Sequence, residues 1–250
     1  METIQRIKSH LAEEASGHKI ADVRIGLGYT AVMLENRQTG LAGTPLAHLR
    51  HGCTLFDGML PLEGKKASGL LKFIESRDPL ETAVGLATAN SLANTWSPQL
   101  GTGDVLEAID LGSGDHVAMV GNFAPLAGAV RKTGARLTIF EQIKRPRNGL
   151  LPSGEIAALL PECTVCLLTA TSIINHTFEK IIKSAAQCRS VVLLGASTPL
   201  IPGAFSGTPV TCLSGVIVKE PEKLLSIISC GGGMKKFGGV IEKVNLPAAG

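Results

Sequence analysis

The sequence predicts an α/β protein, with a Rossmann-like, open and mainly parallel sheet after a smaller α+β part. Apolar residues make up 44% of the 250 residues, which is enough for a sizeable core. Between residues 116 and 218, short apolar runs alternate with helical segments, as they do in βαβ units. Residues 1–100 instead show a helix, a hairpin and further helices. We therefore expect an N-terminal α+β domain over residues 1–100 and a Rossmann-like domain over residues 101–250.

Spacing predicts the first elements. Ile4, Ile7 and Leu11 fall on one helical face and predict a helix over residues 1–15. Residues 19–36 hold two strand-like runs separated by glycines, which indicates an antiparallel hairpin. Residues 40–66 are rich in Gly, Pro and polar residues and are expected to be loop, whereas residues 67–76 predict a short amphipathic helix.

The helix with the clearest start signals covers residues 79–94. Asp78 is suited to the N-cap, Pro79 to the first helical position, and Glu81 can reach back toward the cap. The interior of this helix consists mostly of small residues, which allow another backbone to come close. Asn90 interrupts it and needs partners if it is buried. It either makes a structural hydrogen bond to a neighbouring loop or lies at the interface with the second domain, facing the crevice.

Strands and helices then alternate. The expected strands are residues 116–121, 136–141, 164–170, 190–196 and 210–218, and the expected helices are residues 124–134, 175–187 and 221–233. Apolar runs this continuous are typical of strands covered on both faces, joined by right-handed crossovers. The segment GGGMKKFGG is expected to be a mobile terminal loop, with a flap over a crevice as the alternative.

Polar, turn-forming residues follow four of these strands. They are Gly121 and Asn122, Glu141, then Thr169, Thr171 and Asn175, and finally Gly195, Ser197 and Thr198. Ligands of open α/β sheets bind at the carboxyl ends of the strands, so these residues are expected to surround one crevice. As single residues, Thr169, Thr171 and Asn175 are equally suited to capping helices. Free N–H groups at the helix starts favour a carboxylate or phosphate in the ligand.

Glu141 lies twenty residues after Gly121, the distance at which dinucleotide-binding folds place an acidic residue on a ribose. The loop GNFAPL, however, is not G-x-G-x-x-G, and Phe123 takes space that a pyrophosphate would need. NAD is therefore not expected. An adenosine ligand without pyrophosphate, such as an S-adenosyl group, stays open, and so does a solvated carboxylate at the sheet edge.

Metal-binding signals are few. His48, His51 and Cys53 combine ligand types that suit zinc or copper, although a solvated loop explains them as well. Cys163 and Cys166 would point to opposite faces of a strand, so they do not indicate a metal site. The six cysteines in this long, aliphatic chain are expected to be free thiols. His176 is expected to be exposed, with a role as a base near the crevice as the alternative.

Composition excludes several classes of partner. The net charge of +3 is too small and dispersed for a nucleic-acid-binding protein. No apolar run reaches the ~20 residues of a spanning helix, and the N-terminus has no apolar signal core. We expect a cytoplasmic protein with neither nucleic-acid nor membrane partners, and a homo-oligomer is compatible with the sequence.

Five segments resemble a known family. They are ETAVGLATANSLAN, HVAMVGNFAPL, LTIFE, LLTATSIINHTFEKII and LLGASTPLIPGAFSGTPV, in this order. Together they are similar to the putative heavy-metal chelation proteins of bacteria and archaea. The resemblance implies an enolase N-terminal-like domain packed on a Rossmann-like domain, with a site between them. It also implies a role in handling heavy metals or their ligands.

On the matching motifs, the resemblance implies that ten residues line or shape this site. They are Asn90, Gly121, Asn122, Glu141, Thr169, Thr171, Asn175, Gly195, Ser197 and Thr198. The leading hypothesis is a protein that binds a small polar or anionic ligand, or a metal chelate, in an interdomain crevice. The alternatives are a transferase-type enzyme with an adenosyl or nucleotide cofactor and a non-catalytic regulatory or partner-binding protein.

Overall fold

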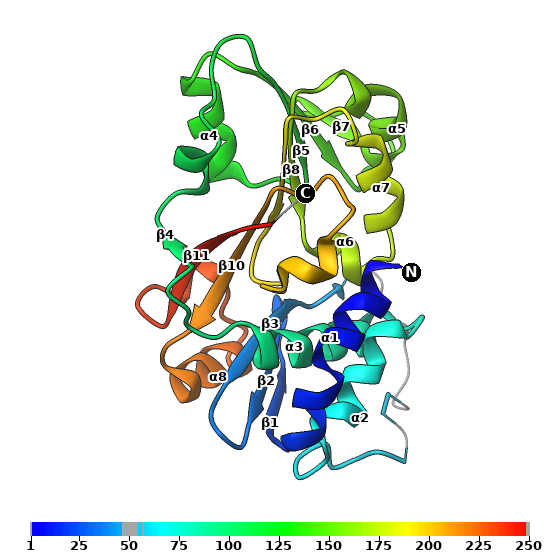
Figure 1. Cartoon of the computed structure of the whole chain (residues 1–250), viewed down its shortest axis with the longest axis vertical. Helices are drawn as coiled ribbons and strands as arrows, with labels where there is room; N and C mark the ends of the chain where they lie inside the picture. The colour runs from blue at the N-terminus through cyan, green and yellow to red at the C-terminus, as the bar shows by residue number, and fades with distance from the viewer. Residues whose placement is uncertain (1, 47–54, 57, 249–250) are drawn as a thin grey trace.

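The computed structural model describes residues 2–46, 55–56 and 58–248. It contains a three-stranded antiparallel sheet and an eight-stranded, mainly parallel sheet. The smaller sheet and its helices lie at one end of the elongated molecule, and most of the larger sheet lies at the other (Figure 1). The predicted α/β class, with a Rossmann-like sheet after a small α+β part, is confirmed.

The N-terminal part is a sheet covered by helices. Its elements are α1 (Thr3–Gly17), β1 (Ile20–Ile25), β2 (Tyr29–Leu34), β3 (Thr39–Gly43), α2 (Ala67–Leu71), a 3₁₀ helix (Lys72–Glu75) and α3 (Pro79–Ala93). The predicted hairpin is present as β1 and β2, and β3 pairs with the other edge of β2. Helix α3 packs on β2 and β3, and α1 packs on α2 and α3.

Strand β3 lies inside the stretch predicted to be loop, so that part of the prediction is wrong. The segment contains Gly40 and Gly43, which are poor strand formers. Gly40 is required because β3 passes very close to α3. A Cβ atom on Gly40 would lie 2.1 Å from the carbonyl oxygen of Ala87 and 2.1 Å from the amide nitrogen of Ser91. The small residues of α3 thus allow the close backbone approach that the sequence indicates.

Helix α3 starts as expected, with one difference. The Asp78 carboxylate accepts hydrogen bonds from the amide of Leu80 at 2.9 Å and that of Glu81 at 3.3 Å. Glu81 does not bond the Asp78 amide directly. Instead, the Ser76 hydroxyl donates to Glu81 at 2.5 Å and accepts from the Asp78 amide at 3.0 Å. A serine therefore bridges the two acidic residues at the helix start.

The larger sheet has the order β4-β11-β10-β9-β8-β5-β6-β7. Its strands are β4 (Gly101–Thr102), β5 (His116–Val120), β6 (Arg136–Glu141), β7 (Leu150–Pro152), β8 (Val165–Thr169), β9 (Ser190–Leu194), β10 (Cys212–Val218) and β11 (Ile241–Pro247). Neighbours from β7 to β10 are parallel, and β11 pairs antiparallel with β10 and β4. The five predicted strands are present, whereas β4, β7 and β11 were not predicted.

Helices cover both faces of this sheet. They are α4 (Ala124–Lys132), α5 (Ile156–Leu159), α6 (Thr171–Ile174), α7 (Phe178–Ser184) and α8 (Pro221–Ser229). Short 3₁₀ helices cover Val105–Ala108, Ser153–Glu155, Leu160–Glu162, Pro202–Phe205 and Met234–Lys236. Helix α4 lies on one side of the sheet and α5 and α7 on the other (Figure 1). The helix predicted over residues 175–187 is shorter, because His176 has a φ of +53° and separates α6 from α7.

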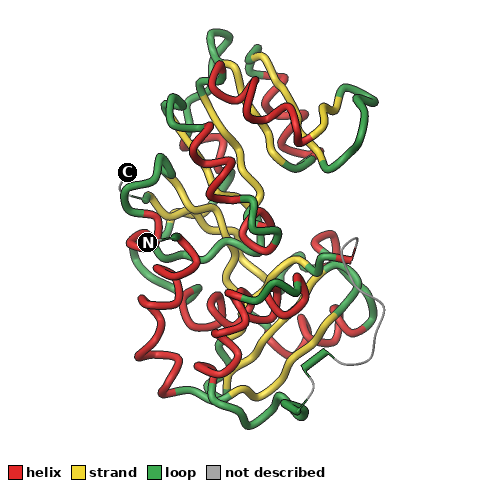
Figure 2. The backbone as a smooth tube through the Cα atoms, turned by 90° about the vertical axis from the view of Figure 1, so that its right-hand side faces the viewer, coloured by secondary structure: helices red, strands yellow, loops and turns green. Residues whose placement is uncertain are grey.

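The order of the parallel strands determines where a ligand can enter. The chain runs from β5 outward through β6 to β7, then returns to the other side of β5 and continues through β8, β9 and β10. The direction of winding thus reverses between β5 and β8. In open α/β sheets, such a switch point leaves a crevice at the carboxyl ends of the two strands. The backbone trace in Figure 2 shows the two parts of the molecule stacked on each other, with loops between them.

Buried asparagines join the two parts. The Asn94 side chain donates to the carbonyl oxygens of Thr198 at 3.0 Å and Val216 at 3.3 Å, and accepts from the Leu200 amide at 2.9 Å. The Asn90 side chain donates to the carbonyl oxygens of Leu41 at 2.7 Å and Ala196 at 3.4 Å. These bonds hold helix α3 against the loop after β9.

The GGGMKKFGG segment is docked rather than loose. Phe237 is fully buried, and its ring meets that of Tyr29 edge to face with centroids 5.2 Å apart. The segment forms the 3₁₀ helix Met234–Lys236 and leads into β11. The segment is therefore not the mobile loop that the sequence predicts, because the buried Phe237 ring holds it against Tyr29.

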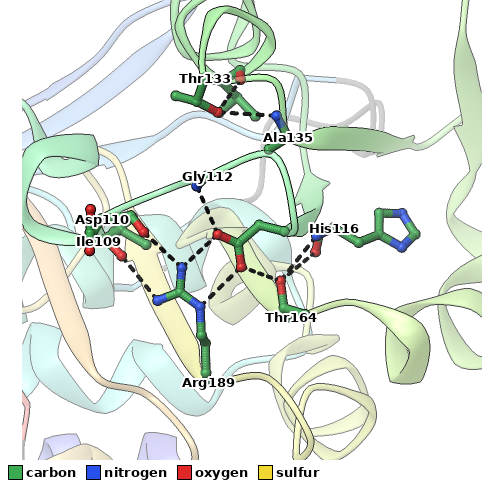
Figure 3. A network of polar contacts seen from close by, with 10 residues as sticks. Ile109, Asp110, Gly112, His116, Thr133, Ala135, Thr164 and Arg189 are labelled. Atoms are coloured by element: carbon green, nitrogen blue, oxygen red, sulfur yellow. Dashed lines mark hydrogen bonds and ion pairs between the residues drawn. The ribbon is translucent and has the colours of Figure 1, made fainter.

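A polar network lies at the amino-terminal ends of β5, β8 and β9, on the edge of the large sheet away from the carboxyl ends of these strands (Figure 3). The Arg189 guanidinium donates to both carboxylate oxygens of Asp115, at 3.1 and 2.8 Å, and the Thr164 hydroxyl and the Gly112 amide donate to the same carboxylate. Arg189 also donates to the carbonyl oxygens of Ile109 and Asp110. The Arg189 guanidinium, together with the other two donors, holds the pKa of Asp115 well below its usual range.

No helix within the described residues is long and apolar enough to cross a bilayer.

Candidate functional site

Two adjacent cavities lie at the carboxyl ends of the parallel strands. The strand-tip cavity, of about 490 Å³, is lined by residues 120–123 and 140–142, by Ser153 and Gly154, and by residues of α5, α6 and α7. The interface cavity, of about 420 Å³, lies between residues 28–29 and 43–46 of the N-terminal part and residues 194–197 after β9. The two cavities share a wall made of Phe123, Gln142, Thr169, Thr171 and Asn175.

Eight of the ten residues expected at the site line one or both cavities. Gly121, Asn122 and Glu141 line the strand-tip cavity, Gly195 and Ser197 line the interface cavity, and Thr169, Thr171 and Asn175 lie in the shared wall. The structure therefore brings the four strand tips together.

Asn90 and Thr198 do not line either cavity. Asn90 is fully buried between β3 and the loop after β9, where its amide group donates the two hydrogen bonds described above. Its Oδ1 atom has no partner within the described residues. Thr198 is also fully buried, and its hydroxyl donates to the Leu193 carbonyl oxygen at 3.5 Å. Asn90 thus lies at the interface with the second part of the chain, as the second interpretation expects, but it makes structural hydrogen bonds there and does not line the crevice.

Two backbone amides, one after β5 and one after β6, donate hydrogen bonds to the Glu141 carboxylate. Gly121 has a φ of +92°, and a Cβ atom there would lie 3.1 Å from the side chain of Thr169. This conformation favours glycine and turns the chain sharply after β5. The Asn122 amide then donates to Glu141 Oε2 at 3.1 Å, and the Gln142 amide donates to Glu141 Oε1 at 2.8 Å. The Glu141 carboxylate is therefore oriented by one backbone N–H on each oxygen.

Three hydroxyl groups lie in or next to the shared wall. The hydroxyls of Thr169 and Thr171 lie 2.9 Å apart and bond each other. Ser172, which lines the strand-tip cavity, is 2% exposed, and its Oγ has no hydrogen-bond partner in the described part of the chain. Buried hydroxyls without a partner are uncommon in proteins. Ser172 is therefore a group that a bound molecule could satisfy.

The interface cavity is closed on one side by a direct bond between the two parts of the chain. The Gly43 amide donates to Ser197 Oγ at 2.8 Å, and a Cβ atom on Gly43 would lie 3.0 Å from the Thr171 side chain. This bond joins the end of β3 to the tip of β9. Helix α6, which begins in the shared wall, lies between the large sheet and the N-terminal part (Figure 1).

Several lining residues were not predicted from the sequence. Lys180 of α7 and Glu141 are the charged residues that line the strand-tip cavity, while Tyr29, Thr44 and Leu46 reach the interface cavity from the N-terminal part. Lys180, Tyr29, Thr44 and Leu46 do not follow a strand of the parallel sheet, which is the signal that located Glu141 and the other predicted residues. The sequence predicts one helix over residues 175–187, but His176 separates α6 from α7. The face of α7 that carries Lys180 could therefore not be oriented from the sequence.

The described residues offer no cluster of metal-binding side chains. They contain no group of three or more His, Cys, Asp or Glu side chains arranged to hold a metal. The cavities offer hydroxyl, amide and carboxylate oxygens, which suit hard ions, whereas heavy metals prefer sulfur and nitrogen ligands. The candidates His48, His51 and Cys53 lie outside the described residues.

The described cysteines are free thiols, as expected, and do not line either cavity. Cys163 precedes β8 rather than lying in it, and its side chain packs in the same core cluster as Cys166. The expected opposite orientation along one strand therefore does not apply. Burial raises the pKa of Cys163 and of Cys188 to about 11, so both are protonated at neutral pH.

His176 is exposed, as expected. Its Nε2 bonds the carbonyl oxygen of Ser76 at 2.8 Å, so this residue joins the two parts of the chain and does not line either of the cavities described above.

Comparison with known proteins places the chain in a family. Residues 104–247 match the model of the DUF364 family and residues 8–93 match a second model, DUF4213, both described as "putative heavy-metal chelation". The chain belongs to the DUF364 family. The resemblance inferred from the strand tips and from the helix at residues 79–94 is therefore confirmed. Neither description names a ligand.

Nearly the whole chain is covered by each of three similar proteins. An uncharacterized protein of Methanocaldococcus jannaschii is 22% identical over 250 residues, covering 97% of this chain and 95% of that protein. The crystal structure of a DUF364 protein of unknown function from Pyrococcus horikoshii superposes with a TM-score of 0.86 at 23% identity, covering 98% and 99% of the two chains. A DUF364 protein from Desulfitobacterium hafniense gives 0.83 at 20% identity, covering 98% and 97%. At such low identity, these structures support the fold alone.

Proposed function

We propose that this DUF364 protein binds a small, polar, anionic ligand in the crevice formed by the strand-tip and interface cavities. The observation that carries the proposal is the shared wall, where hydroxyl and amide side chains from one strand tip face both cavities at the topological switch point. Concave sites with a few convergent polar groups are the usual form of small-molecule sites. Open cavities at this position favour a ligand over a role in partner binding alone.

Charges near the strand-tip cavity support an anionic ligand. Lys180 lines the cavity, and it makes no ion pair with another residue of the described part. The loop between Gln142 and Ser153, both of which line the cavity, carries Lys144, Arg145 and Arg147, and all three are exposed. Neighbouring cations of this kind raise the local concentration of anions.

Helix α4 adds to this electrostatic environment. It begins directly after Asn122 and Phe123, and no side chain caps its N-terminus. The positive end of its dipole therefore lies beside the strand-tip cavity and favours negative charge there. The Glu141 carboxylate opposes this field only in part, because two backbone amides already donate to it.

Any heavy metal that the protein handles would arrive already coordinated. Apart from the Lys180 ammonium group, the polar side chains that line the cavities within the described residues offer oxygen donors, so the sulfur or nitrogen ligands of a soft ion would have to come from the bound molecule. The metal is then part of the cargo, and the protein recognises the negatively charged groups of the chelator.

Calorimetry and thermal shift with citrate, nickel citrate and nickel chloride test this proposal. We expect citrate and nickel citrate to raise the melting temperature, because a ligand at 100 times its Kd stabilises a protein by about 2.7 kcal/mol. We expect Thr171→Val to weaken citrate binding at least tenfold, since it removes one hydroxyl from the shared wall, and exposed Thr102→Val to bind as the unchanged protein does. Stabilisation by nickel chloride but not by citrate would contradict delivery as a chelate.

A further inference from the structure

We propose that the strand-tip cavity holds a purine nucleoside joined to a short group rather than to a pyrophosphate, with its ribose on Glu141. The inference rests on the proposed function, because the short group would cross the shared wall toward the interface cavity. It assigns a chemical class to the ligand and a separate task to each cavity.

The first argument is the position of Glu141. It is the last residue of β6, and β6 lies directly beside β5 at the switch point. In doubly wound folds, this position carries the acidic residue that accepts hydrogen bonds from a ribose diol. In this chain, the Asn122 and Gln142 amides each occupy one lone pair of Glu141. A carboxylate has about four acceptor sites, so one on each oxygen is left for two hydroxyl groups.

The second argument is the apolar wall behind Glu141. Phe140, Ile156, Ala157 and Ile181 line the same cavity and come from β6, α5 and α7. They provide a surface against which a flat base can pack. Serine, threonine and lysine side chains of the same cavity, among them Ser153 and Lys180, can bond the polar edge of that base. At about 490 Å³, the cavity falls in the usual range of ligand pockets.

The third argument concerns what the cavity excludes. A Cβ atom on Gly121 would lie 3.6 Å from the ring of Phe123, and one on Gly195 would lie 3.9 Å from the other edge of that ring. The Phe123 ring thus stands between the tips of β5 and β9, across the start of α4. Pro125 also removes an amide from the first turn of α4. A pyrophosphate would need this space and this amide, whereas a thioether or sulfonium group attached to the ribose would not.

The fourth argument is the hydroxyl of Ser172. It belongs to a residue that lines the strand-tip cavity, it is buried, and it has no hydrogen-bond partner within the described residues. An unpaired buried hydroxyl costs free energy. A polar ligand atom in the cavity would satisfy it. This observation is independent of Glu141 and points to the same cavity.

Calorimetry with matched nucleosides tests the inference on the full chain. We expect S-adenosylhomocysteine and 5′-methylthioadenosine to bind in the micromolar range and NAD to bind at least 100-fold more weakly. We expect adenosine to bind at least tenfold more tightly than 2′-deoxyadenosine, because Glu141 would lose a hydroxyl partner. A comparison of guanosine with adenosine identifies the preferred purine base, and micromolar binding of either nucleoside supports the proposal.

Two variants make the test specific. In Glu141→Ala, the preference for adenosine over 2′-deoxyadenosine is expected to fall to about one, whereas exposed Glu155→Gln keeps it. Ala157→Trp fills the base wall and is expected to abolish nucleoside binding, whereas citrate is smaller, does not need the base wall and is expected still to bind in the crevice. The melting temperature of this variant confirms that it folds. Equal binding of adenosine and 2′-deoxyadenosine by the unchanged protein would overturn the inference. So would NAD binding as tightly as S-adenosylhomocysteine, or failure of every nucleoside to bind at millimolar concentration. In each case, citrate binding reports separately on the proposed function.

Discussion

Replacing Gly40 with valine is expected to lower the free energy of unfolding by about 4 kcal/mol. The reason is the contact between β3 and α3, where even a Cβ atom would lie 2.1 Å from two backbone atoms of α3. Backbone atoms cannot move aside as the end of a flexible side chain can, so β3 or α3 must shift as a whole. Urea denaturation followed by circular dichroism measures the loss as a lower midpoint.

Gly69→Ala is the matched control for this prediction. Gly69 lies in α2 of the same part of the chain, and a Cβ atom there would have no heavy atom within 4 Å. Because alanine favours helices, this variant is expected to be as stable as the original protein or up to ~1 kcal/mol more stable. A Gly40→Val protein with an unchanged urea midpoint would show that β3 and α3 are not in contact in solution.

Replacing Asp115 with alanine is expected to cost about 2 kcal/mol at pH 7, because three donors lose their shared acceptor. The loss of unfolding free energy is limited because the Arg189 side chain is 46% exposed and can be solvated by water in the variant. Arg189 also keeps its bonds to the carbonyl oxygens of Ile109 and Asp110. Urea unfolding at pH 7 measures this loss, and the exposed Glu107→Ala variant serves as its control.

The same network makes the stability depend on pH. The pKa of Asp115 is lower in the folded chain than in the unfolded chain, mainly because Arg189 donates to its carboxylate. The stabilisation is therefore complete above the unfolded pKa of about 4 and is lost as the pH falls toward the folded value. We expect the difference between the original protein and Asp115→Ala to shrink between pH 5 and pH 3. A difference that stays constant over this interval would contradict this assignment.

The strand tips could be predicted from the sequence because their signal is local. The buried runs that end at Gly121, Glu141, Thr169 and Gly195 are short, apolar and followed by polar turn residues. The carboxyl ends of parallel strands lie at one edge of a sheet, so finding the strands also located the residues that line the crevice. Their convergence depended on the strand order, which no local pattern determines, because the crossover rule fixes only the handedness of each connection.

The elements that the sequence did not predict depend on tertiary contacts. Strand β3 contains two glycines and is a strand because Gly40 fits against α3. Strand β11 contains charged residues and pairs antiparallel with β10 on one edge and with the distant β4 on the other. Asn90 has the polarity expected of a ligand-binding residue, yet its amide bonds two buried carbonyl oxygens. No local pattern distinguishes these cases from loops or binding residues, because the deciding partner is distant in sequence.

The pairing of β4 with β11 has a consequence for how the protein is made. Strand β4 belongs to the connector that follows the N-terminal part, and it bonds Val244 and Asn245 of β11. The Asn245 side chain also donates to the Gly103 carbonyl oxygen, 142 positions away in sequence. Since a ribosome releases the chain from its N-terminus onward, the connector cannot be fastened until residues 241–247 have emerged. The pairing of β4 with β11 is therefore formed only after nearly all of this sequence has been translated, later than the Gly43–Ser197 and Asn90–Ala196 bonds that also join the two parts.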